Sequence, residues 1–177
     1  KFNYTRTSTN YEWRTPYHKE EGKASFTDGM QSKDNDDKAN YLYGKKEVWY
    51  THSIETRTHV AEFHISPRKD GRGAKSSLGG MSTTAENSLY KLDSIVLYAK
   101  TDKLNGVAEP LKTVHFEYNY ELCENTPNSN ATVDDKGSVA GGKLTLKKVY
   151  FTYGLSGKGV LNPYVFTYAD FDLDGTM

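Results

Sequence analysis

Two segments of the chain repeat one pattern of β-forming residues, and this repeat constrains the fold more than any other feature. Each unit begins with a leucine, continues through two polar residues to an isoleucine or valine, and then enters an aromatic-rich stretch. A loop containing glycine, a proline and a Phe-x-Tyr sequence complete the unit, which covers about residues 89–118 in one copy and 143–168 in the other. The loops are too short for a parallel crossover, so each unit predicts an antiparallel hairpin. A two-strand unit buries its apolar side only by lying beside other copies.

A strict alternation of side chains marks the centre of the chain. The alternation predicts a strand with one face formed by His59, Ala61, Phe63 and Ile65 and the other by Thr58, Val60, Glu62 and His64. The run over residues 47–54 is also typical of a strand. Pro67 removes a ladder donor, and residues 70–73 have turn chemistry. We therefore expect residues 66–88 to form a long surface loop.

The composition favours strands and excludes some classes of partner. Of the 177 residues, 36% are hydrophobic and 13% aromatic, and aromatic side chains suit the half-buried surface of a sheet. Lys+Arg 23 balances Asp+Glu 23, whereas nucleic acids and anionic membrane surfaces are bound by clustered basic residues. We expect no nucleic-acid partner. We also expect no membrane span in this segment, because no apolar run approaches the roughly 18 residues of a membrane helix.

The expected fold is mainly β: an antiparallel meander of long hairpins that forms a curled sheet or β-sandwich, with long polar loops. Residues 1–40 are rich in Thr, Asn, Lys and Asp and predict an extended polar segment with short edge strands. Residues 41–177 are expected to form a β-hairpin repeat domain. Because the chain begins with Lys1 rather than Met, we expect a segment excerpted from a larger protein.

Histidines near the central strands raise a zinc hypothesis. Glu62 and His64 lie two apart on one predicted strand, so their side chains project to the same side, and His52 could approach from the neighbouring strand. The alternative is that these are exposed side chains among threonines and glutamates. Cys123 is the single cysteine, which excludes an internal disulfide and predicts a small side chain at a strand end.

The sharpest motif lies at the C-terminus, where Asp170, Asp172 and Asp174 alternate before Gly175. Alternate carboxylates followed by a glycine are how a calcium-binding loop begins, so calcium is the one cofactor that the sequence raises. Residues 171–176 also resemble the first motif of haloacid-dehalogenase-like phosphatases, which would make Asp172 a nucleophile and Asp174 an acid/base. Both interpretations require residues that this chain lacks. The third interpretation is a polar linker into a following module.

Trp13 and Trp49 are the candidate ligand-binding residues, because exposed aromatic faces with polar rims suit carbohydrate. Ordinary cross-strand packing is the alternative. The chain contains no G-x-S-x-G, P-loop or H-E-x-x-H sequence, and no strand-to-helix transition follows its glycine-rich stretch over residues 71–80. The sequence therefore offers no catalytic residues, and we expect no enzyme.

Several β segments resemble parts of very large, mostly uncharacterised Bacteroidota proteins with an RHS-like, insecticidal-toxin-complex-like β organisation. The similar segments are Tyr41–Tyr50, Ile54–Phe63, Lys112–Tyr118 and Gly142–Gly154. The resemblance covers most of residues 41–168. It implies export, a secreted or cell-surface setting, and a scaffold or shell role in a multi-module chain. It brings no catalytic residues, and the tyrosine-aspartate repeats of an RHS core are absent here.

The favoured function is a non-catalytic structural tile of such an exported protein. Its partners would be neighbouring modules of the same polypeptide or a partner protein. The alternatives are a carbohydrate- or protein-binding β module, with a glycan as possible ligand, and a fragment that ends where a phosphatase or calcium loop starts. A tile predicts an exposed apolar face or edge, which separates it from a closed, self-contained domain.

Overall fold

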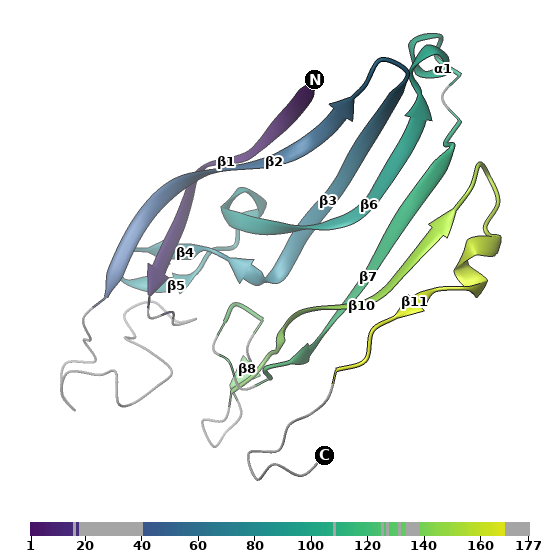
Figure 1. Ribbon diagram of the computed structural model, residues 1–177. Helices are drawn as coiled ribbons and strands as arrows, with labels where there is room; N and C mark the ends of the chain where they lie inside the picture. Colours follow the sequence, from purple (N-terminus) through teal and green to yellow (C-terminus); the bar gives the residue numbers. More distant parts are fainter. Residues whose placement is uncertain are drawn as a thin grey trace, which may run out of the picture.

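Seven strands build one antiparallel sheet, in the order β1-β2-β3-β6-β7-β10-β11 (Figure 1). The structure, a computed structural model, describes residues 1–15, 17, 41–107, 109–124, 126, 128–130, 132–133 and 139–168. The strands of the sheet are β1 (Phe2–Thr15), β2 (Leu42–Glu55), β3 (His59–Arg72), β6 (Ser88–Ala99), β7 (Lys112–Leu122), β10 (Lys143–Thr152) and β11 (Tyr164–Val165). Neighbours in the sheet follow one another along the chain, apart from short insertions. The predicted mainly β, antiparallel meander is therefore confirmed.

The remaining elements are short and lie in the connections. They are the hairpins β4 (Ala74–Ser76) with β5 (Gly79–Met81) and β8 (Thr132–Val133) with β9 (Val139–Ala140), the 3-10 turns η2 (Ala85–Asn87) and η3 (Lys158–Leu161), and the helix α1 (Lys100–Leu104). In the described part of the chain, no helix has the length and apolar character needed to cross a membrane.

Both repeated units form antiparallel hairpins. In the first, β6 pairs with β7 from Ser94 opposite His115 to Leu97 opposite Lys112. In the second, β10 pairs with β11 over two positions only, so the second hairpin is narrower at the edge of the sheet. β7 and β10 join the two units along most of their length. The repeat therefore forms four adjacent strands.

The sheet curls but stays open. β2 pairs with β3 over only three positions, Ser53 to Glu55, and the ribbon of β1 and β2 then diverges from β3 (Figure 1). The far end of this ribbon returns to β3, because the hydroxyl of Tyr11 donates a hydrogen bond to the carbonyl oxygen of Gly71 at 3.3 Å. Burial raises the pKa of Tyr11, so the phenol stays a donor in this contact. β1 and β11 are the two edges of the sheet and are not joined into a barrel.

The loop expected over residues 66–88 is wrong. β3 continues through Pro67 to Arg72, where it pairs again with β6, and a small hairpin follows. The glycines let neighbouring segments approach the backbone closely. A Cβ at Gly71 would lie 2.9 Å from the Cβ of Leu89, and a Cβ at Gly73 would lie 2.1 Å from Oδ1 of Asn87. Turn-forming residue types were therefore misinterpreted as a loop, when they allow a strand to bend closely past its neighbours.

The polar N-terminal segment was expected to form short edge strands, which is wrong for its first part: it supplies one long edge strand, β1, because β2 offers a partner along its whole length. β1 pairs with β2 from Phe2 opposite Ile54 to Thr15 opposite Leu42, with three interruptions of the register. Residues 18–40 lie outside the described part of the chain. Cys123 is exposed and follows directly after the end of β7.

Candidate functional site: a half-buried apolar sheet face

One face of the sheet carries almost only apolar side chains across its four central strands. Cross-strand pairs point to the same face and successive residues alternate, so the register assigns each side chain. Phe63, Ile95, Val114 and Phe151 form one continuous row across the four strands. We call this surface the apolar face; it consists of Ala61, Phe63 and Ile65 on β3, Leu92, Ile95 and Leu97 on β6, Val114, Phe116 and Tyr118 on β7, and Leu146, Val149 and Phe151 on β10.

Two β-bulges keep this face continuous. Leu92 and Ile95 are three residues apart and would point to opposite faces of a regular strand, but the register skips one residue of β6 between them. The same shift lies between Leu146 and Val149 on β10. An inserted residue restores the phase of the side chains and adds local twist. The repeated sequence of a leucine, two polar residues and an isoleucine or valine is therefore the sequence of a bulge.

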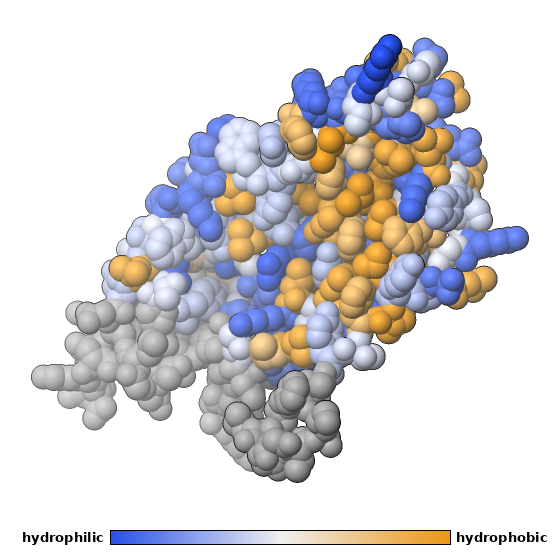
Figure 2. All heavy atoms as spheres, in the orientation of Figure 1, coloured by the Kyte–Doolittle hydropathy of each residue, from blue (hydrophilic) through white to orange (hydrophobic). Residues whose placement is uncertain are grey.

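Parts of the apolar face are covered within the described chain: Lys112, opposite Leu97, holds its Nζ 4.1 Å from the centre of the Phe151 ring, and the backbone N–H of Lys69 on β3 donates to the hydroxyl of Tyr120 on β7 at 2.9 Å. All its side chains are half-buried, and none reaches the burial of a protein core. Among the described residues, the buried hydrophobic side chains are Tyr11, Val48, Val60, Ala74 and Val96, none of which belongs to this face. Figure 2 shows apolar atoms gathered where Figure 1 places the middle strands. A sheet with one apolar face normally packs it against a second layer, and a monomer rarely exposes so large a contiguous patch.

The opposite face of the sheet mixes polar and apolar side chains and includes Val60 and Val96, two of the buried hydrophobic residues. His115 stacks on Tyr150 at 4.6 Å, and its Nε2 lies 2.9 Å from Oγ1 of Thr152. Desolvation lowers the pKa of His115, which favours the neutral imidazole in this stack. Glu117 and Lys148 pair across the strands at 3.2 Å. The apolar face is the more uniformly apolar of the two, which makes it the candidate contact surface.

The two tryptophans do not form a joint site. Trp13 pairs with Gly44 across β1 and β2, and a Cβ at Gly44 would lie 2.9 Å from the indole ring, so Trp13 fills the space above a glycine. Trp49 is 53% exposed, and its Nε1 donates to Glu47 at 3.0 Å. The guanidinium of Arg6 lies 5.5 Å from the centre of the Trp49 ring. Positions 44 and 49 of β2 differ by an odd number, so the two rings lie on opposite faces of the ribbon.

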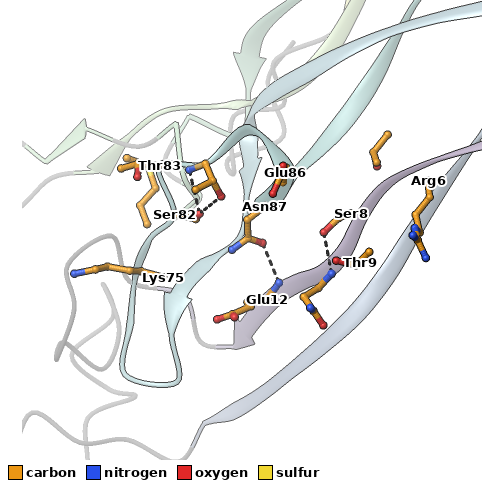
Figure 3. Close-up of a pocket in the computed structure, with 13 residues that line it drawn as sticks. Arg6, Ser8, Thr9, Glu12, Lys75, Ser82, Thr83, Glu86 and Asn87 are labelled. Atoms are coloured by element: carbon orange, nitrogen blue, oxygen red, sulfur yellow. Dashed lines mark hydrogen bonds between the residues drawn. The ribbon is translucent and has the colours of Figure 1, made fainter.

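A polar groove of about 870 Å³ lies between β1 and the segment from β4 to η2 (Figure 3). Its walls carry mostly hydroxyl, amide and charged groups, including Arg6, Ser8, Thr83 and Glu86. Asn87 connects the walls, because its Oδ1 accepts from the backbone N–H of Glu12 at 2.9 Å and its Nδ2 donates to the carbonyl of Ala74 at 2.8 Å. Among the described residues that line the groove, none is aromatic.

Ion pairs hold the outer strands of the sheet. Hydrogen bonds from Lys45 and then Tyr43 lower the pKa of Glu12, and Lys45 Nζ lies 2.8 Å from its carboxylate. Hydrogen bonds from Asn3 and Lys100 lower the pKa of Glu55. These pairs join β1 to β2 and β2 to the start of α1, and they are structural contacts rather than parts of a reactive cluster.

No group of three metal-ligating side chains converges in the described residues. Glu62 forms an ion pair with Lys103 of α1, and the structure does not bring His52 and His64 together with it. The calcium and phosphatase hypotheses rest on Asp170, Asp172 and Asp174, which lie outside the described residues.

Comparison with known proteins brought no match. No protein-family model, curated protein or solved structure is similar to this chain at a significant level. The geometry of the sheet is therefore the basis for any functional proposal.

Sequence reasoning found three of the twelve residues of the apolar face. The alternation of β3 assigned Ala61, Phe63 and Ile65 to one side, and the register confirms this. The residues that β6 and β10 add to this face were missed, because in both strands the leucine is three positions before the next apolar residue and a regular alternation would put the two on opposite faces. The odd spacing in both copies of the repeat was the signal that could have predicted a bulge.

Proposed function

We propose that this chain is a non-catalytic structural tile of a larger exported or cell-surface, RHS/toxin-like multi-module protein. In this role the apolar face packs against a second β layer, supplied by a neighbouring module or a partner protein. The apolar face carries the proposal: it runs across four strands, and its side chains stay half-buried in the described residues.

The size of the apolar face fits a protein interface. It spans four strands about 4.8 Å apart and about eight residues rising about 3.3 Å each, which is about 500 Å² in projection. Flanking residues on β2 and β11 extend it further. A standard interface buries about 800 Å² on each partner. The face is therefore large enough to form the centre of a stable layer contact.

The isolated chain provides a direct test. If the apolar face is an interface, the purified chain will associate in a concentration-dependent way and will bind a hydrophobic dye such as ANS. Sedimentation velocity from about 1 to 100 μM measures the association, because interfaces of this size give micromolar or tighter binding. A chain that stays monomeric over this range and binds no dye would contradict the proposal.

The polar groove favours a second candidate, a binding module for a small polar ligand such as a glycan. Hydroxyl and amide side chains of both walls face one open space, and Arg6 connects the groove to Trp49. Trp49 is therefore a reporter, and binding in the groove would change its fluorescence. A glycan array without any response, together with unchanged tryptophan emission, would remove this candidate.

A further inference from the structure

The two edges of the sheet differ in their capacity to accept another strand. At β1 the register is interrupted between Arg6 and Ser8 and again between Ser8 and Tyr11. The N–H of Glu12 is already bonded to Asn87, and the N–H of Asn10 is bonded to the hydroxyl of Ser8. Bulges, charges and capped backbone groups are the features that prevent edge-to-edge pairing. The β1 edge is therefore blunted.

The β11 edge is uncharged; its protections are its length of two residues and Pro163 just before it. Residues 159–168 contain no charged side chain. Tyr164 is 64% exposed and Val165 58%, although both are good strand formers. Tyr164 contacts Phe151 edge-on with ring centres 6.0 Å apart, so the edge continues the apolar face. An uncharged, apolar edge strand is a typical site for pairing with another chain.

The backbone at this edge is also available. The N–H of Phe166 donates to the carbonyl of Lys147 on β10 at 2.9 Å. Alternate residues of an antiparallel strand point to opposite sides, so the backbone groups of Val165 point away from β10, and extending the same alternation past the end of β11 gives Thr167 the same direction. In the described part of the chain no strand lies on that side.

The internal repeat identifies the kind of strand that fits there. β11 holds in the second unit the place of β7 in the first, and Phe166 and Tyr168 correspond to Phe116 and Tyr118. The outer side of β7 pairs with β10, which places Val149 opposite Phe116 and Leu146 opposite Tyr118. The strand that completes β11 should therefore carry the same features as β10.

We infer that the edge formed by Tyr164–Tyr168 accepts an antiparallel β-strand of a neighbouring module with the Leu-x-x-Val-x-Phe pattern of β10. The bulge in this pattern directs the leucine, the valine and the phenylalanine to the apolar face, opposite Tyr168, Phe166 and Tyr164. The sheet thus grows in one direction only, from the blunted β1 edge to the open β11 edge. This inference rests on the proposed tile role and names the edge through which the tile is extended.

A synthetic peptide with residues 143–153 of this chain is the probe for the full 177-residue protein. We expect saturable binding in NMR titrations and slower amide exchange at Val165 and Thr167, with no change at the β1 edge. Thr167→Pro removes one outward N–H and should weaken binding about three- to tenfold, the effect of one ladder hydrogen bond. Thr167→Val keeps that N–H and is the matched control, with unchanged binding.

A second peptide tests the register. Deletion of the residue that corresponds to Lys147 removes the bulge and turns the leucine to the wrong face, so this peptide should not bind. Equal binding of both peptides, no protection at Val165 and Thr167, or pairing of β11 with a second copy of the protein in place of the peptide would overturn the inference. A variant with a disrupted apolar face, Ile95→Asp, should still bind the peptide. The two proposals fail in different experiments. If the tile role is wrong, the chain does not associate through the apolar face in sedimentation velocity. If this inference is wrong, the peptide does not slow amide exchange at the β11 edge.

Discussion

Replacing Ile95 by aspartate should abolish association through the apolar face while leaving the sheet folded. Ile95 lies at the centre of this face, with Phe63 and Val114 as its cross-strand neighbours. Full burial of an isoleucine contributes about 1.5–3 kcal/mol, and since this side chain is already half-buried, about 1 kcal/mol of that remains for the interface. A buried carboxylate without a partner adds several kcal/mol of desolvation cost, and aspartate is too short to reach water.

The expected loss is therefore about 3 kcal/mol or more, a weakening of association by about 100-fold or more. The matched control is Ser94→Asp, which places the same residue one position away on the opposite face, between His64 and His115. Both variants place aspartate in β6, but Ile95→Asp loses up to about 1 kcal/mol more strand propensity, so a difference in association reports the face only after the unfolding data correct for stability. Sedimentation velocity measures the association constant, and urea unfolding measures the stability of each variant.

Equal association of the two variants would refute the reasoning, because it would mean that the apolar face is not the contact surface. Loss of association together with a loss of the folded state in Ile95→Asp alone would show that this face is already a core.

Three further predictions concern the fold. Gly142→Ala should destabilise the chain by at least about 2 kcal/mol more than Gly106→Ala, measured by urea unfolding: both glycines have positive φ, but only at Gly142 would a Cβ meet a backbone oxygen, at 1.8 Å. Asn87→Ala should cost about 1–3 kcal/mol and speed amide exchange at Glu12, because two backbone groups lose their partner; unchanged exchange would show that the cap is dispensable. Glu12→Gln should reduce the loss of stability at acid pH. The folded pKa of Glu12 lies below its ordinary value, so the ionised carboxylate contributes its full stabilisation above about pH 4.5. This contribution is lost as the pH falls through the folded pKa, and the glutamine variant does not have it to lose. Urea unfolding between about pH 3 and 6 measures this, and identical slopes for the wild type and Glu12→Gln would contradict it.

The sequence predicted the architecture well because the signals were local. Alternation along β3 placed Ala61 and Phe63 on one face, and the hairpin repeat gave four neighbouring strands in their correct order. Short loops permit only antiparallel pairing, so the meander followed from loop length alone.

The parts that the sequence did not predict depend on packing between distant segments. The bend after Pro67 and the close approach of Gly73 to Asn87 become visible only when β4 and η2 lie beside β1. The polar groove has the same origin, since its two walls are about 70 residues apart along the chain. The sequence predicted Trp49 as an exposed carbohydrate-binding side chain. Its contacts with Glu47 and Arg6, and its separation from Trp13, depend on strand pairing and could not be predicted from positions in the sequence.

The paired bulges have a consequence for how this chain avoids fibrils. An exposed apolar sheet with an uncharged edge has the composition of an aggregation-prone surface. Stacking into cross-β layers, however, requires flat strands whose side chains stay in phase over their whole length. The extra residues at Asp93 and Lys147 interrupt that phase at the same level of both hairpins and increase the twist of the sheet. Any surface that covers the apolar face must share this twist, which a complementary folded layer can do and a stack of flat strands cannot.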